Sequence, residues 1–177
     1  MNKIVKIVRT AFDSWEIRPT FAGCHNSDMV KLVKMSPEIF ARWNQKIWVL
    51  YREELIRSGM SEAAADKNVE SNIKETMPNG ELVDGQFVFE VFENDDHIGN
   101  VWLANYDNDW FVYDIDIEEE FRGRGLGRAT MRAIEDYVRA QGGSKIELSV
   151  FGFNTVAKNL YLSEGYETTR LSMSKNL

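Results

Sequence analysis

Apolar residues in the first third of the chain are spaced as in an amphipathic helix. Between residues 37 and 58, six side chains form one apolar stripe at helical intervals: Phe40, Trp43, Ile47, Leu50, Tyr51 and Leu55. Ser36 can cap the first turn with its hydroxyl, Pro37 suits the first helical position, and Gly59 suits the residue after the end. The pattern therefore predicts a long helix with one buried face.

The rest of the pattern predicts short strands and two further helices. The predicted strands span residues 29–35, 87–93, 97–105, 110–117 and 145–150. One helix runs from a capping Ser61 to about Met77, and another covers residues 127–141. Residues 1–28 hold an alternating segment followed by a mixed stretch, and this N-terminal extension receives no assignment.

Composition favours a single domain. The chain has 177 residues, of which 44% are apolar and 12% aromatic, enough for one sizeable core. The longest apolar run, residues 47–51, is far shorter than the ~20 residues that span a bilayer. Lys3, Lys6 and Arg9 interrupt the stretch where a signal peptide would need an apolar centre. We therefore expect a cytoplasmic protein that does not enter a membrane.

Residues that commonly bind metals are sparse. Cys24 is the single cysteine, so no internal disulfide can form. His25 lies beside it, and the other histidine, His97, is far along the chain. Because no spacing here matches a known ligand set, we expect no bound metal and surface or packing roles for both histidines.

Charge is unevenly distributed along the chain. Residues 1–60 carry a net +4, residues 61–120 a net −15 and residues 121–177 a net +4, which gives −7 in total. An acidic middle suits a cationic acceptor, and a basic final third suits an anionic cofactor. The run Glu118–Glu120 can also be a merely solvated segment. The overall negative charge argues against a nucleic acid as substrate.

A glycine-rich hexapeptide, Arg122–Gly127, lies between the strand at 110–117 and the helix at 127–141. The first N–H groups of a helix lack intrahelical partners, and the helix dipole favours negative charge there, so such a turn can hold phosphate. A Walker loop is excluded because no Lys follows the glycines. A dinucleotide fingerprint fits poorly, since Arg128 or Thr130 occupies the position of its third glycine.

Two motifs in the second half of the chain resemble signatures of the GNAT superfamily of acyl-CoA-dependent N-acyltransferases. The first is Arg-x-x-Gly-x-Gly, formed by Arg122, Gly125 and Gly127. The second is Asn-x-x-Ala-x-x-Leu-Tyr followed by Gly and an aromatic residue, and it is made by Asn154, Ala157, Leu160, Tyr161, Gly165 and Tyr166. The motifs occur in the order and at the separation typical of the family. The resemblance covers roughly residues 85 to 174.

The resemblance implies a fold and a co-substrate. It implies one α/β domain over residues 29–177, with a mixed, twisted sheet of six to seven strands and about four helices, in the order β-α-α-β-β-β-α-β-α-β. It implies acetyl-CoA, held between two strands that diverge near the glycine loop. The expected cofactor-binding residues are Ile115, Asp116, Ile117, Arg122, Gly123, Arg124, Gly125, Leu126, Gly127, Arg128, Asn154 and Lys158.

Transfer to an amine requires a proton acceptor. A lysine-like amine with a pKa of about 10.4 is mostly protonated at pH 7. The free energy needed to deprotonate it at this pH is roughly 4–5 kcal/mol. We expect Asp114 to be the general base and Glu90 to be the second candidate; for each, the alternative is a solvent-facing strand residue. Strict alternation would place Val112, Asp114 and Asp116 on one face of the strand, and the intervening residues on the other.

Departure of the thiolate calls for a proton donor. Tyr161 is our candidate general acid, because a phenol can protonate a sulfur leaving group. Asn154, Ala157, Lys158 and Tyr161 are spaced to share one helix face. Without the resemblance, a tyrosine on such a face would more simply be a core residue. The resemblance also implies direct attack by the amine on the thioester, without an acyl-enzyme.

The function hypothesis is therefore N-acetyl transfer from acetyl-CoA to a primary amine of a small, cationic acceptor. Two alternatives stay open: a non-catalytic acyl-CoA sensor, and an enzyme that acetylates a protein or peptide amine. Aromatic residues of the first helix, Trp43, Trp48 and Tyr51, can line an acceptor pocket or belong to the core. Homodimer formation also stays open.

Overall fold

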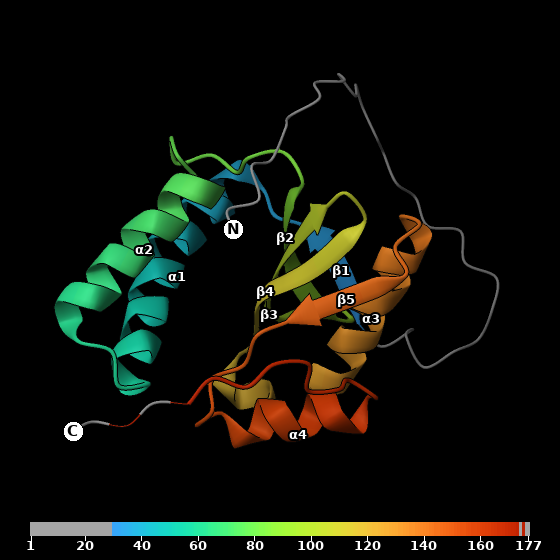
Figure 1. Cartoon of the computed structure of the whole chain (residues 1–177). Helices are drawn as coiled ribbons and strands as arrows, with labels where there is room; N and C mark the ends of the chain where they lie inside the picture. The colour runs from blue at the N-terminus through green and yellow to red at the C-terminus, as the bar shows by residue number, and fades with distance from the viewer. Residues whose placement is uncertain (1–29, 174, 176–177) are drawn as a thin grey trace.

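The computed structural model describes residues 30–173 and 175 (Figure 1). The helices are α1 (Pro37–Arg57), α2 (Glu62–Thr76), α3 (Leu126–Ala140) and α4 (Thr155–Ser163). The strands are β1 (Lys31–Lys34), β2 (Gln86–Glu93), β3 (Asp96–Tyr106), β4 (Asp109–Ile117) and β5 (Lys145–Leu148). The N-terminal extension, with Cys24 and His25, lies outside the described residues.

The five strands form one sheet in sequential order, β1-β2-β3-β4-β5. Strands β1 to β4 pair antiparallel, and β5 pairs parallel to β4, so the sheet is mixed as expected. The crossover between β4 and β5 contains α3, as a parallel connection requires. In Figure 1, α1 and α2 lie together on one side of the sheet, with α3 on the other.

Two apolar clusters fix these layers. One lies between the sheet and α1, where Trp43 packs against Trp102 of β3 with ring centroids 5.6 Å apart, and Val88 of β2 joins it. The other contains the buried face of α3, with Met131, Ile134 and Val138, and also Tyr161 of α4. We call the two faces of the sheet the α1 face and the α3 face.

A β-bulge in β4 changes which side chains share a face. The register with β3 passes from Leu103↔Val112 to Trp102↔Asp114, so Tyr113 is an extra residue. Val112 packs in the α3-face cluster together with Ile115 and Ile117. Strict alternation, which grouped Val112 with Asp114 and Asp116, is therefore wrong.

After the bulge, the α1 face of β4 carries its polar side chains. Asp114 lies opposite Trp102, and Tyr113 stacks on the same indole with ring centroids 4.7 Å apart. Directly opposed residues on paired strands project to the same face, so Asp114 joins these aromatic residues on the α1 face. Asp116, two residues further, projects to that face as well.

The expected sheet of six to seven strands is too large, because the structure has five strands in its described residues. The expected order ends in a strand after α4, but residues 166–173 form no regular element there. An open hollow of about 1090 Å³ is lined by both β5 and residues 166–170. The sheet ends at β5, so this segment does not extend it.

No helix among the described residues is long and apolar enough to span a bilayer. Residues 30–173 and 175 also contain no group of three or more His, Cys, Asp or Glu side chains arranged to hold a metal ion.

Candidate active site

The glycine loop leads into α3 with an open N-terminus. Side chains cap the other three helices, with Ser36 at α1, Ser61 at α2 and Asn154 at α4, whereas the N-cap of α3 is Gly125. Gly125 has φ of 83°, a left-handed conformation that suits glycine, and it offers no side chain to the first N–H groups of the helix. These N–H groups stay available to an anion at the positive end of the helix dipole.

Close packing holds the start of α3 against α4. A Cβ atom on Gly127 would lie 3.3 Å from Cδ2 of Leu160, tighter than most real contacts. The glycine at this position therefore lets the two helices approach closely, which places α4 beside the loop.

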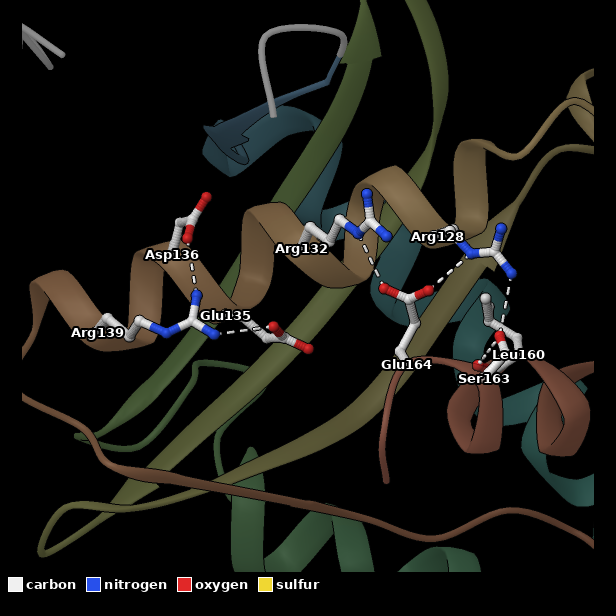
Figure 2. A network of polar contacts seen from close by, with 8 residues as sticks. All are labelled: Arg128, Arg132, Glu135, Asp136, Arg139, Leu160, Ser163 and Glu164. Atoms are coloured by element: carbon white, nitrogen blue, oxygen red, sulfur yellow. Dashed lines mark hydrogen bonds and ion pairs between the residues drawn. The ribbon is translucent and has the colours of Figure 1, made fainter. Parts of the chain in front are cut away.

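A buried carboxylate also joins the two helices, as Figure 2 shows. The side chain of Glu164 is only 8% exposed and accepts from Nε of Arg128 at 2.7 Å and from Nε of Arg132 at 2.9 Å. Arg128 also donates to Oγ of Ser163 at 3.0 Å. The side chain of Arg128 thus points toward α4, and its backbone N–H belongs to the start of α3.

Replacing Glu164 with Gln should destabilise the domain by about 1–2 kcal/mol, because two arginines lose a shielded carboxylate partner. The melting temperature should fall by about 2–4 °C for each kcal/mol. Glu167→Gln is the matched control, since Glu167 is exposed three residues further along. An unchanged melting temperature in the Glu164 variant would show that this network does not hold α4 in place.

The other two arginines of the loop, Arg122 and Arg124, contact β-strands instead of α4. Arg122 donates through Nε to the carbonyl of Ile117 at 2.6 Å, and its Nη2 lies 3.3 Å from a carboxylate oxygen of Asp116. Arg124 pairs with Glu93 at 2.7 Å. Both guanidinium groups are more than half exposed, so a phosphate can compete for them.

The sheet opens beside this loop. Pairing of β4 with β5 extends only from Asp109↔Lys145 to Val112↔Leu148. Residues 113–117 keep β3 as a neighbour on one side, but β5 has ended on the other. The backbone of Ile115 to Ile117 therefore presents an edge that can hydrogen-bond an extended ligand, next to the anion-binding end of α3.

Asp114 projects near this opening, and protein encloses its carboxyl group. Its Oδ2 is shielded from solvent and has no hydrogen-bond partner among the described residues. Burial, and then the negative charges of Asp116 and Glu54, raise the pKa of Asp114 from 3.8 to about 7. Such a carboxyl group can exchange a proton near neutral pH.

Tyr161 of α4 lies close enough to respond to that carboxylate. It is 8% exposed and packs near Tyr166, with ring centroids 5.9 Å apart. Burial, with a further contribution from the charge of Asp114, raises the pKa of Tyr161 to about 12. The phenol therefore keeps its proton at physiological pH. Tyr161 packs in the α3-face cluster, whereas Asp114 projects to the α1 face, and the charge of Asp114 still acts on the phenol.

Glu90 shares the α1 face but lies further from this pair. It is opposite Asn100 on β3, and Asn100 is opposite Asp116 on β4, so one strand separates the two acids. Neighbouring strands are about 4.8 Å apart, which puts Glu90 roughly 10 Å from Asp116 along this row.

Glu54, near the end of α1, was not among the residues predicted from the sequence. Its carboxylate interacts with Asp116, and its charge acts on Asp114. Glu54 follows Tyr51 by three positions and precedes Leu55, so it borders the apolar stripe of the helix. An acidic residue at the edge of an apolar helix stripe could have indicated this position from the sequence.

The two remaining cofactor candidates occupy different environments. The side-chain oxygen of Asn154 accepts from the backbone N–H of Ala157 at 3.1 Å, so it caps α4. Lys158 is exposed and lines the hollow beside β5, as does Tyr161. No residue of the glycine loop lines that hollow.

Comparison with known proteins finds one matching family model and similar bacterial proteins. The model of the acetyltransferase (GNAT) family matches residues 48–166. The uncharacterized N-acetyltransferase YdgE of Bacillus subtilis is 26% identical over 133 residues, which are 72% of this chain and 85% of YdgE. The uncharacterized N-acetyltransferase YycN of the same organism is 27% identical over 157 residues, or 84% of this chain and 99% of YycN.

The crystal structure of YycN is also similar. It superposes with a TM-score of 0.77 at 25% sequence identity, and the match covers 84% of this chain and 98% of that one. The region that matches the family model includes both the glycine loop and α4, and it ends at Tyr166.

Proposed function

The chain belongs to the acetyltransferase (GNAT) family, enzymes that use acetyl-CoA, and we propose that it moves the acetyl group directly to a primary amine of a small, cationic acceptor. One observation carries the proposal beyond the family: Asp114 offers a buried, unpartnered carboxyl oxygen beside the opening of the sheet. An ammonium ion is the complementary partner for such a group, because it brings both a positive charge and hydrogen-bond donors.

The acceptor nitrogen must lose two protons, and the departing thiolate must gain one. Asp114 takes the first proton from the acceptor ammonium, and the free amine forms a bond to the acetyl carbonyl carbon as the carbon–sulfur bond breaks. Tyr161 gives its proton to the departing thiolate, and the resulting phenolate takes the second proton from the newly acetylated nitrogen. Once Asp114 is neutral, one of the two causes of the raised pKa of Tyr161 disappears, which makes the transfer to the thiolate easier.

The residues around the opening can also bind the thioester substrate. The residues that would hold acetyl-CoA are the open N-terminus of α3, for the pyrophosphate, and the free edge of Ile115 to Ile117, for the pantetheine arm. Acetyl-CoA supplies an activated acyl group at the end of that arm. The arginines of the loop would add positive charge around the phosphates.

Acetyl-CoA should stabilise the protein against heat, by about 2.7 kcal/mol at a concentration 100 times its Kd. Gly125→Ala should weaken this binding about 10-fold or more, because a side chain at the N-cap strains the loop that presents the N–H groups. Gly142→Ala is a matched control, with φ of 81° against 83° and similarly open space, but beyond the other end of α3.

Calorimetry with acetyl-CoA measures both variants. Equal weakening by the two substitutions would indicate general strain and contradict the assignment of the loop. Absence of heat with the unmodified protein at millimolar acetyl-CoA would contradict the proposed donor. A panel of amines with acetyl-CoA then tests the acceptor class, and preference for anionic or neutral acceptors would overturn the cationic assignment.

A further inference from the structure

The middle of the glycine loop is weakly fixed by its own main chain. In the described part of the chain, the backbone N–H groups of residues 123–127 donate no hydrogen bond to a main-chain carbonyl. Gly123 and Gly125 have φ of 75° and 83°, and the space around both is open. Glycine restricts its backbone less than any other residue. The main chain alone therefore does not hold this part of the loop in one conformation.

Contacts with other elements fix the two ends of the loop. Arg122 donates to the carbonyl of Ile117 at the end of β4, and Gly127 packs against Leu160 of α4. Arg124 lies between these two anchors, with a glycine on each side. Its side chain is therefore the only one with which the middle of the loop can reach another element.

An ion pair connects Arg124 to the hairpin of β2 and β3. Its Nη2 lies 2.7 Å from a carboxylate oxygen of Glu93, the last residue of β2. The side chain of Glu93 is only 15% exposed. The guanidinium also lies 5.6 Å from the ring centroid of Phe121. Because water screens a shielded carboxylate less than an exposed one, this pair restrains Arg124 more than a fully exposed pair would.

The position of Glu93 is itself fixed by the sheet. Glu93 continues the alternation of Phe89 and Val91, which pack in the α3-face cluster, and it pairs with Asp96 across the turn. In the sheet, β2 and β3 lie on one side of β4, and the opening lies on the other side. The ion pair therefore restrains the loop from the side opposite to the opening.

We propose that Glu93 is a positioning residue for acetyl-CoA: through Arg124 it holds the glycine loop in the conformation that presents its N–H groups to the pyrophosphate. This inference rests on the proposed function, in which the loop binds the pyrophosphate. The ion pair stays intact when acetyl-CoA binds. Without the pair, the loop occupies more conformations, of which only a fraction can bind, and the apparent Kd rises by the inverse of that fraction.

Glu93→Gln should raise the Kd of acetyl-CoA about 2- to 5-fold in calorimetry, the range of a partly exposed ion pair. The direction of the change is decisive, because removing a negative charge beside an anion-binding loop would by electrostatics alone strengthen binding. In steady-state kinetics, KM for acetyl-CoA should rise while kcat stays nearly unchanged, since Asp114 and Tyr161 are intact. A general loss of structure would lower kcat as well.

Asp96→Asn is the matched control, because Asp96 is exposed, lies opposite Glu93 in the same hairpin and carries the same charge. It leaves the pair with Arg124 in place, so the Kd of acetyl-CoA should stay the same or fall slightly. In an Arg124→Gln background, Glu93→Gln should cause no further weakening, since the ion pair is already broken.

An unchanged or lower Kd in Glu93→Gln would overturn the inference, and a lower value would show that the phosphate takes Arg124 from Glu93. Equal weakening by Asp96→Asn, or additive weakening in the double variant, would overturn it too. Failure of the proposed function would look different, because acetyl-CoA would then give no heat with the unmodified protein.

Discussion

Asp114→Asn should lower kcat/KM for the acceptor amine by about 10²- to 10⁴-fold near pH 8, the usual contribution of a general base. The effect should shrink below about pH 6, because the wild-type carboxyl group, with a pKa of about 7, is then mostly protonated. The pH–rate profile of the wild type should therefore rise through pH 7, and that of the variant should follow only the ionisation of the free amine. Steady-state kinetics with acetyl-CoA at saturation measures both profiles.

The same substitution should stabilise the fold at pH 8. The folded-state pKa of Asp114 lies above its ordinary value of 3.8, so between about pH 4 and 7 the folded state binds more protons than the unfolded state. The contribution of this carboxyl group to the free energy of unfolding is therefore greatest below pH 4, and it is lost as the pH rises through 7. A higher melting temperature for Asp114→Asn at pH 8, but not at pH 4, is thus expected.

Asp109→Asn is the control for both measurements, because Asp109 is exposed at the other end of β4. It should change neither the rate nor the melting temperature appreciably. Normal rates for Asp114→Asn at every pH would transfer the role of base to Glu90 or to water. A raised melting temperature without a loss of rate would show that Asp114 is buried for structural reasons alone.

Tyr161→Phe should reduce kcat by about 10²- to 10³-fold while leaving the Kd of acetyl-CoA nearly unchanged. The phenylalanine keeps the buried ring but removes the proton that the thiolate needs. An acetyl thioester with a more acidic thiol should be much less affected, because its thiolate departs without a proton. This dependence on the leaving group separates proton donation from a loss of packing.

Tyr166→Phe provides the comparison, since Tyr166 packs against Tyr161 and has its own raised pKa through burial and the neighbouring Glu135. It should retain most of kcat with both thioesters. If Tyr161→Phe lost the same factor with good and poor leaving groups, Tyr161 would be a positioning residue and the proton would come from water.

The regular elements could be predicted from the sequence because each has its own local signal. The apolar stripe from Phe40 to Leu55, with Ser36 and Pro37 ahead of it, predicted a helix that the structure places at Pro37–Arg57. Strands β2, β3 and β4 were placed within one residue at each end, and β1 and β5 within two, both being shorter than expected. These patterns arise from residues that are close together in the sequence, so they can be recognised without knowledge of the fold.

Features that depend on pairing between distant segments were harder to predict. The bulge at Tyr113 follows from the register between β3 and β4, although the apolar positions do change phase between Val112 and Ile115. The last strand was expected from the family resemblance, but its formation depends on contact with the edge of β5, where the sheet ends in the structure. Glu54 joins the site only through the packing of α1 on Trp102.

The extra residue in β4 sets the geometry of the opening as well as the direction of a side chain. A bulge bends its strand and increases the local twist, and Tyr113 comes directly after Val112, the last residue that pairs with β5. A chain shortened by this one residue would keep Asp114 on the α1 face, since the faces beyond the bulge follow from Val112 by simple alternation. It would lose the bend and the added twist that a bulge gives to its strand. The geometry of the opening and the face on which Asp114 lies are therefore separable, and a change in the length of β4 can alter the one without altering the other.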